Sequence, residues 1–205
     1  AFAKILIETS IDGVDASDVH AVLVARHGKL VFEEYFHGFH RDELHDTRSA
    51  AKSLTSTLIG AAILKGAKVR PDTPVYAAMN GGTAPAGLDV RAQALKLEHL
   101  LTMSSGLDCD DSDPASPGNE DTMQEQTAQP DWYRYTLDLK MVRTPGEKAV
   151  YCSVNPNLAG GVLARTTGQP LAELVDELLA RPLQFGRYAL FLSPTGGAYM
   201  GGGVR

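Results

Sequence analysis

One stretch decides the fold of this chain: Ser49-Ala-Ala-Lys-Ser-Leu-Thr-Ser-Thr-Leu-Ile-Gly-Ala-Ala-Ile-Leu-Lys65. Its apolar side chains recur near the spacing of a helix, and Gly66, directly after it, is a residue type that commonly ends one. Ser49 and Lys52 form the only Ser-x-x-Lys pattern in the 205 residues. Three residues apart on a helix, a hydroxyl and an ammonium lie on one face and come within hydrogen-bonding distance. We therefore predict a helix that carries both groups at its N-terminal end.

The start of a helix suits this pair of side chains to acyl chemistry. The positive end of the helix dipole and burial both disfavour a charged lysine, so Lys52 could act as a neutral base toward the Ser49 hydroxyl. The backbone N–H of Ser49, left without a helical partner, could donate to the oxygen that becomes negative during attack on a carbonyl. For this motif taken alone, a helix-capping serine followed by an exposed lysine is the alternative.

A second motif, Tyr151-Cys152-Ser153, follows the turn residues Pro145 and Gly146 and is the only Tyr-x-Ser or Tyr-x-Asn in the chain. A phenol close to a lysine could take the serine proton and return it to a leaving group. An ordinary amphipathic tyrosine with a satisfied hydroxyl is the alternative. The occurrence of both motifs in one chain favours the catalytic interpretation.

Together the two motifs resemble the first two motifs of the serine β-lactamase and penicillin-binding-protein superfamily, in its class C β-lactamase-like, DD-peptidase and esterase branch. Two further stretches agree with this resemblance, Leu100-Leu-Thr-Met-Ser-Ser-Gly-Leu107 and Pro145-Gly-Glu-Lys-Ala-Val-Tyr151. The resemblance covers nearly the whole chain. It implies a β-lactamase/transpeptidase-like fold of the α+β class, in which an antiparallel sheet is flanked by helices and carries a largely helical insertion.

The resemblance also implies a site and a reaction. It makes Ser49 the nucleophile, Lys52 and Tyr151 the groups that share proton transfers, and Ser153 a substrate-binding residue. The implied protein is a serine hydrolase that forms an acyl-enzyme with a small-molecule ester or amide, like a carboxylesterase or amidohydrolase, and needs no cofactor and no metal. β-Lactamase or DD-peptidase activity is the alternative within the family. A non-catalytic ligand-binding or assembly protein on the same scaffold is the alternative of another class.

Two departures from the family pattern bear on these expectations. Ser153 stands where the family often has Asn, and a short hydroxyl holds an amide carbonyl less well, which makes esters or unusual amides easier substrates to imagine than β-lactams. The family's third motif, Lys-Thr-Gly or His-x-Gly, is not found, and the nearest string is Thr195-Gly196 after Pro194. We therefore expect the chain to be the N-terminal portion of the domain, completed by a C-terminal segment or a second chain.

Along the chain we expect a single catalytic domain over residues 1–205, in three parts. Residues 1–66 start the α/β body and hold the nucleophile helix, residues 67–185 form a helical region, and residues 186–205 return toward the sheet. The expected strands are residues 21–25, 30–37 and 188–192, and the further helices are residues 97–103, 119–128, 131–141, 155–167 and 171–180. Residues 71–87 should be irregular, and residues 108–117 should form a surface loop.

Composition argues against several other classes of function. The net charge is −6 and no basic run occurs, so nucleic acid is not an expected partner. No apolar stretch reaches the roughly 20 residues of a membrane span. The histidines form no ligand pair, so no metal site is expected, and Cys109 and Cys152 should be free thiols because two cysteines 43 residues apart match neither a disulfide framework nor zinc-ligand spacing. Bacterial cytoplasm and periplasm both stay open as locations.

Overall fold

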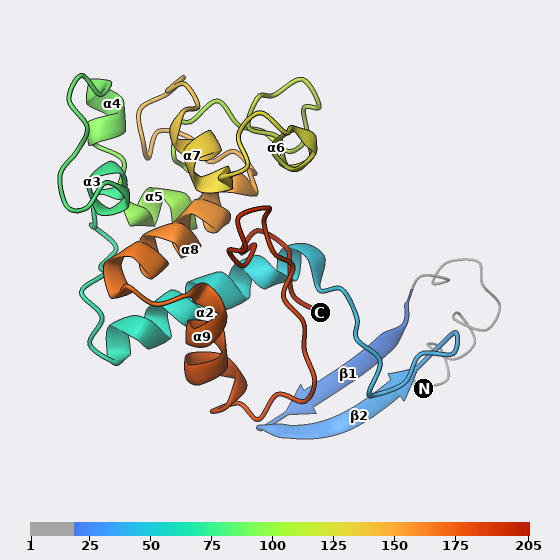
Figure 1. Cartoon of the computed structure of the whole chain (residues 1–205). Helices are drawn as coiled ribbons and strands as arrows, with labels where there is room; N and C mark the ends of the chain where they lie inside the picture. The colour runs from blue at the N-terminus through green and yellow to red at the C-terminus, as the bar shows by residue number, and fades with distance from the viewer. Residues whose placement is uncertain (1–18) are drawn as a thin grey trace. The chain divides into compact units, whose positions relative to one another are not determined.

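The computed structural model describes residues 19–205, which divide after His45 into two units. The first unit is a hairpin of two antiparallel strands, β1 (Ala21–Arg26) and β2 (Lys29–Tyr35) (Figure 1). His27 and Gly28 form its turn with φ values of 50° and 71°, and two positive φ values in succession suit the right-handed twist of the strands. The two N-terminal strands predicted from the sequence are confirmed. The first eighteen residues of the predicted 1–66 segment lie outside the described residues.

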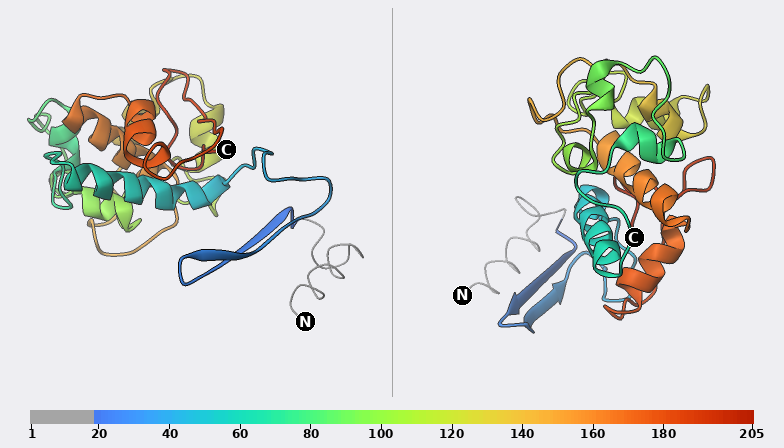
Figure 2. Two further views of the ribbon diagram at one scale, coloured as in Figure 1. Left: turned by 90° about the horizontal axis from the view of Figure 1, so that it is seen from below. Right: turned by 90° about the vertical axis from the view of Figure 1, so that its left-hand side faces the viewer.

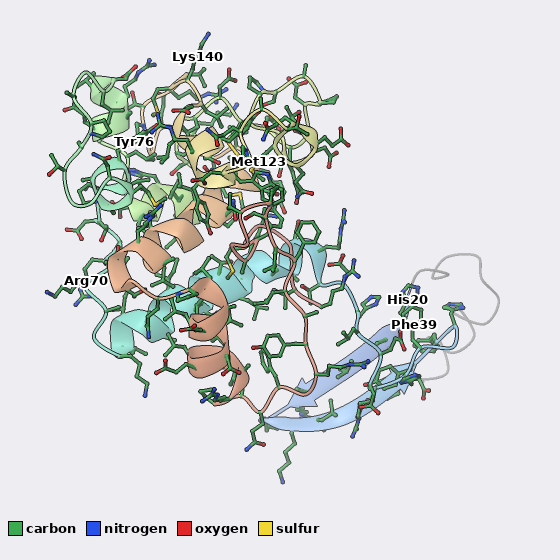
Figure 3. All side chains as sticks on the ribbon, viewed as in Figure 1. His20, Phe39, Arg70, Tyr76, Met123 and Lys140 are labelled. Carbon is green, nitrogen blue, oxygen red and sulfur yellow. A yellow bond between two sulfur atoms is a disulfide. The ribbon has the colours of Figure 1, made fainter. Side chains whose placement is uncertain are left out.

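Aromatic side chains close the open end of this hairpin. The rings of His20 and Phe39 stack with their centroids 4.0 Å apart (Figure 3), and the ring of His45 lies edge-on to His20 at 5.0 Å. Along the strands, in contrast, Leu23 and Val31 are each more than half exposed. A two-stranded sheet with exposed apolar side chains is marginally stable by itself.

The second unit, Asp46–Arg205, is built mainly from helices. They are α2 (Ala51–Leu64), α3 (Val75–Met79), α4 (Val90–Gln93), α5 (Leu97–Leu101), α6 (Glu120–Glu125), α7 (Trp132–Leu137), α8 (Val154–Thr167) and α9 (Leu171–Val175), with a short 3-10 turn η1 (Arg48–Ala50) before α2 and a single π turn η2 (Asp176–Ala180) after α9. Together with the antiparallel hairpin, this arrangement confirms the α+β class. None of the helices within residues 19–205 is long and apolar enough to cross a bilayer.

Helix α3 corrects one expectation from the sequence. Residues 71–87 were expected to be irregular because they are rich in Pro and Gly, yet Val75–Met79 form a helix that starts after Pro74. Val75 is fully buried, and Tyr76 is 7% exposed and donates a hydrogen bond from its hydroxyl to the carbonyl oxygen of Leu137 at 3.0 Å. Tertiary packing therefore stabilises a helix too short to form alone.

Helix α8 lies at the centre of the second unit and contacts α2, α3, α5 and α7 (Figure 1). All of residues 154–163 are buried, so the helix is enclosed on every side. Two glycines make this possible. A Cβ atom at Gly160 would lie 2.7 Å from the Cγ atom of Met200, and one at Gly161 would lie 2.9 Å from the Cδ1 atom of Tyr133. The close packing holds the N-terminal end of α8, directly after the second motif, in a defined place.

Helix α2 confirms the helix predicted for the Ser-x-x-Lys stretch. Its buried residues follow one helical stripe, namely Ala51, Thr55, Leu58, Ile59 and Ala62. The chain leaves the helix at Lys65 and Gly66, and Gly66 has a φ of 92°, a conformation that favours glycine. The views in Figure 2 show the C-terminal stretch beside the start of this helix, where the Thr55 hydroxyl donates to the carbonyl oxygen of Met200 at 2.8 Å.

The C-terminal stretch pairs with itself and forms no regular strand, which corrects the strand predicted at residues 188–192. Isolated bridges join Leu190 to Val204 and Leu192 to Ala198, around a turn in which Gly196 has a φ of 82°. The register changes between the two bridges, since two positions on one side correspond to six on the other, so no continuous ladder forms. The single domain over residues 1–205 and the return of residues 186–205 toward the sheet stay predictions.

Candidate active site

Ser49 lies in the turn η1 that leads directly into α2, and its side chain is exposed. The residue before it, Arg48, has a φ of 46°, which residues other than glycine adopt infrequently. Two contacts hold this backbone: the Arg48 N–H donates to an Asp46 carboxylate oxygen at 2.9 Å, and the Thr47 N–H donates to the carbonyl oxygen of Val204 at 3.0 Å. Among the described residues, the backbone N–H of Ser49 has no acceptor.

Lys52 lies one helical turn after Ser49 and meets it as the spacing predicts. Its Nζ atom donates to the Oγ atom of Ser49 at 3.0 Å and to the carbonyl oxygen of Gly201. The close approach of the C-terminal stretch requires glycine, because a Cβ atom at Gly201 would lie 2.3 Å from the hydroxyl oxygen of Tyr199 and 2.8 Å from the carbonyl oxygen of Ser153. The lysine is thus held between the serine and a backbone carbonyl.

Tyr151, the third predicted catalytic residue, also reaches this lysine. The centroid of its ring lies 5.1 Å from the Nζ atom of Lys52, and the residue is 50% exposed. The backbone at Tyr151 is fixed on one side by the start of α8 and on the other by a hydrogen bond from the Asp111 N–H to its carbonyl oxygen at 2.9 Å. The fold therefore brings both Ser49 and Tyr151 to Lys52, although Tyr151 is about a hundred residues away in sequence.

Ser153 is fully buried and points to a different partner. Its hydroxyl and its backbone N–H both donate to the Oδ2 atom of Asp111, at 2.6 and 2.8 Å. The predicted contact between Ser153 and substrate stays a prediction, because the hydroxyl is committed to this carboxylate. Sequence reasoning missed Asp111, since residues 108–117 look like a polar surface loop. The only signal for it is the position of that loop directly after the Leu100–Leu107 stretch.

The two stretches that extend the family resemblance lie against each other. The carbonyl oxygen of Met103 accepts the Val150 N–H at 2.9 Å, and its sulfur accepts the Cys152 N–H at 3.4 Å. Gly106, with a φ of 78°, faces Arg143 so closely that a Cβ atom would lie 2.4 Å from the Arg143 carbonyl oxygen. These contacts hold the backbone on both sides of Tyr151, at Val150 and Cys152.

The prediction of free thiols is wrong, because Cys109 and Cys152 form a disulfide with their Cα atoms 5.8 Å apart. The bond joins the loop that carries Asp111 to the motif that carries Tyr151 and Ser153. The two cysteines are 43 positions apart, the chain between them folds away and returns, and no local feature of the sequence indicates such an approach.

A cavity of about 170 Å³ opens beside Ser49. Its wall contains three carboxylates, two arginines and two aromatic rings; the lining residues are Asp46, Arg48, Ser49, Glu120, Asp121, Gln124, Phe191, Tyr199, Gly202, Gly203 and Arg205. Within residues 19–205, no group of three His, Cys, Asp or Glu side chains is arranged to hold a metal ion.

Tyr199 is a buried tyrosine of the cavity wall. Its hydroxyl donates to the Oε1 atom of Glu120 at 2.6 Å, and the same oxygen accepts the Gln124 side-chain amide at 3.2 Å. Burial, followed by the hydrogen bond to Glu120, raises the pKa of Tyr199 far above its ordinary value. Tyr199 is therefore a permanently protonated donor that orients the Glu120 carboxylate.

The sequence matches a known protein family over most of its length. A model of the family named Beta-lactamase matches residues 12–199. The chain belongs to the beta-lactamase family. The 6-aminohexanoate-dimer hydrolase of Paenarthrobacter ureafaciens is 28% identical to this beta-lactamase-family chain, in an alignment 196 residues long that covers 90% of the chain and 47% of that protein.

Solved structures share the beta-lactamase-like fold of this chain. A candidate beta-lactamase from Bacteroides dorei has a TM-score of 0.73 and 21% identity, covering 98% of this chain and 57% of that one. A candidate 6-aminohexanoate-dimer hydrolase from Bacillus anthracis has a TM-score of 0.70 and 18% identity, covering 97% and 52%. EstCE1, a hydrolase with promiscuous acyltransferase activity, has a TM-score of 0.65 and 19% identity, covering 92% and 53%. The chain thus spans about half the length of the proteins it matches.

Proposed function

We propose that the protein carrying this chain is a serine hydrolase that forms an acyl-enzyme on Ser49. The observation that carries the proposal is the 3.0 Å separation between the Ser49 Oγ atom and the Lys52 Nζ atom, with the Tyr151 ring against the same lysine. A nucleophile within hydrogen-bonding distance of a base, and that base held by a third group, is the arrangement that activated serines use.

The reaction divides into two steps. In the first, the Ser49 oxygen attacks the substrate carbonyl while its proton passes to the Lys52 amine, and the bond to the leaving group breaks as Lys52, directly or through Tyr151, returns the proton to it. The acyl group is then an ester of Ser49. In the second step, Lys52 takes a proton from water, which attacks that ester; the bond to the Ser49 oxygen breaks as Lys52 returns the proton to it, which releases the carboxylic acid and restores the serine hydroxyl.

The start of helix α2 supplies part of the electrostatic stabilisation. The backbone N–H of Ser49 lacks an acceptor among the described residues and belongs to the residue whose oxygen attacks. Such an N–H can donate to the negatively charged oxygen of the tetrahedral intermediate. The carbonyl oxygen of Gly201 keeps the Lys52 side chain near the serine between the two steps.

Small esters and amides are the proposed substrates, in the manner of a carboxylesterase or amidohydrolase. The cavity beside Ser49 is small, about 170 Å³, and two of its carboxylates, Glu120 and Asp121, suit a substrate that carries a positive charge. A 6-aminohexanoate dimer, the substrate in the relative's name, is a short amide with an amino group at one end. The buried hydroxyl of Ser153 offers no side-chain amide for a β-lactam.

Covalent labelling of the full-length protein tests the proposal. A fluorophosphonate should label Ser49, as mapped by mass spectrometry, and a nitrophenyl ester should be turned over. The variant Ser49→Ala should lose both signals. The matched control is Ser53→Ala, which changes an exposed serine one turn along the same helix and should leave both signals unchanged.

The other outcomes select the alternatives. Labelling of Ser49 with faster turnover of a chromogenic cephalosporin than of esters selects a β-lactamase, and release of D-alanine from a peptide selects a DD-peptidase. Absence of any label on Ser49 contradicts the proposal and favours a non-catalytic protein on the same scaffold.

A further inference from the structure

Asp111 forms hydrogen bonds with several parts of the site that are distant from it in sequence. Its Oδ2 atom accepts both the hydroxyl and the backbone N–H of Ser153, at 2.6 and 2.8 Å. Its Oδ1 atom accepts the backbone N–H of Glu120 at 3.0 Å, and its own N–H donates to the carbonyl oxygen of Tyr151 at 2.9 Å. One residue therefore touches the second motif in three places and the cavity wall in a fourth.

The contacts continue from Glu120 to a buried tyrosine. Glu120 accepts the Tyr199 hydroxyl at 2.6 Å. Ser153 is fully buried and Tyr199 is 3% exposed, so water cannot readily replace these partners. A displacement of Asp111 would be transmitted both to the tyrosine beside Lys52 and to the carboxylate on the cavity wall.

The disulfide limits how far Asp111 can move. Cys109 is two residues before Asp111, and Cys152 stands between Tyr151 and Ser153. The loop and the motif are thus joined covalently and by hydrogen bonds within the same few residues. This double connection suggests that the relative position of the two segments matters for more than packing.

Resting on the proposed function, we propose that Asp111 is a positioning residue of the reaction: its carboxylate holds Ser153 and the backbone of Glu120 on the cavity wall, and through Ser153 it keeps Tyr151 against Lys52. The chemistry requires a carboxylate, because three donors converge on two oxygens that must both accept. An asparagine can accept on one side only and presents an NH₂ group to a donor on the other. Asp111 touches none of the reacting atoms and acts through its neighbours.

The test is kinetic and is made on the full-length protein. The variant Asp111→Asn should lower kcat for a nitrophenyl ester by about 10- to 100-fold per titrated active site, since small displacements of reacting groups cost rates of this order. KM should change by less than about threefold. The control Asp113→Asn changes an aspartate of the same loop whose carboxylate accepts a local N–H, from Ala115 at 2.9 Å, and it should retain kcat within about twofold.

A purely structural role would give a different pattern. It would reduce the number of serines that a fluorophosphonate titrates and leave the turnover rate of each titrated site unchanged. A positioning role lowers the rate per site while the far-ultraviolet circular dichroism spectrum and the melting temperature stay close to those of the wild type. Ser153→Ala provides a second variant that removes one of the three bonds, and combined with Asp111→Asn it should add little further loss.

The outcomes distinguish failure of the positioning role of Asp111 from failure of the proposed serine hydrolase activity. Wild-type protein labelled at Ser49, together with an Asp111→Asn variant that keeps kcat within about twofold, overturns the positioning role and leaves the serine hydrolase standing. A loss that follows only the number of titratable sites also overturns it. Wild-type protein without a label on Ser49 overturns both.

Discussion

The Oγ atom of Ser49 lies 3.0 Å from the Nζ atom of Lys52, across the junction between the turn η1 and helix α2. The distance follows from the three-residue spacing, because such residues share one side of a helical turn. What the spacing does not supply is the orientation of the lysine, which the carbonyl oxygen of Gly201 fixes from the C-terminal stretch. Local and distant parts of the chain therefore combine at the proposed base.

Removal of this amine should affect acylation far more than binding. Lys52→Met should slow fluorophosphonate labelling of Ser49 by about two to four powers of ten, the usual contribution of a general base. The matched control is Lys65→Met, which removes an exposed lysine at the other end of α2. Equal labelling rates in the two variants would exclude Lys52 as the base.

The carboxylate of Glu120 should select positively charged substrates. Glu120→Gln keeps an acceptor for the Tyr199 hydroxyl but removes the charge, so KM for a nitrophenyl ester of 6-aminohexanoate should rise about 3- to 10-fold, as for a partly screened charge pair. KM for the uncharged hexanoate ester should stay constant. Glu125→Gln, on the exposed end of the same helix, serves as the control. A parallel rise for both esters would contradict recognition of charge.

The disulfide should stabilise the fold. In the double variant Cys109→Ser with Cys152→Ser, the free energy of unfolding should fall by about 3–4 kcal/mol, because a closed loop of about 44 residues no longer restricts the unfolded chain. Denaturant titrations of this variant and of reduced wild-type protein should agree. Detection of two free thiols in denatured, unreduced protein would restore the original prediction of unpaired cysteines.

Sequence patterns predict the parts of this fold that depend on neighbours along the chain. The turn at His27 and Gly28 separates two β-rich runs, and the apolar stripe of α2 has helical spacing, so both elements are readable locally. Helix α3 is not, because Pro and Gly around it suggest an irregular segment and only the burial of Val75 and Tyr76 stabilises it. The family resemblance, and no local feature, predicts that Tyr151 lies near Lys52.

The remaining features of the site depend on contacts between distant segments. Asp111 looks like one of several acidic residues of a surface loop until the fold places Ser153 against it. Cys109 and Cys152 have a spacing that matches no known ligand or disulfide pattern. A single sequence does not show which distant residues come close together in the fold. For the two cysteines, composition and spacing therefore favour free thiols, which is wrong.

Two tyrosines should make the protein less stable in alkali. Burial, with the nearby Asp138 charge, raises the pKa of Tyr76 to about 12, and burial, with Asp131, raises the pKa of Tyr133 to about 12. Below pH 10 both phenols are protonated in the folded and unfolded chains, so they leave stability independent of pH. Above pH 10 the unfolded chain loses these protons while the folded chain keeps them, so stability falls as the pH rises toward 12.

Urea midpoints measured from pH 8 to 11.5 should be level at first and then decline. Tyr76→Phe should lower stability by about 1 kcal/mol below pH 10, through the lost hydrogen bond to Leu137, and should make the alkaline decline shallower, so that the difference from the wild type shrinks as the pH rises. Identical declines in the variant and the wild type would show that the Tyr76 phenol does not titrate differently on folding.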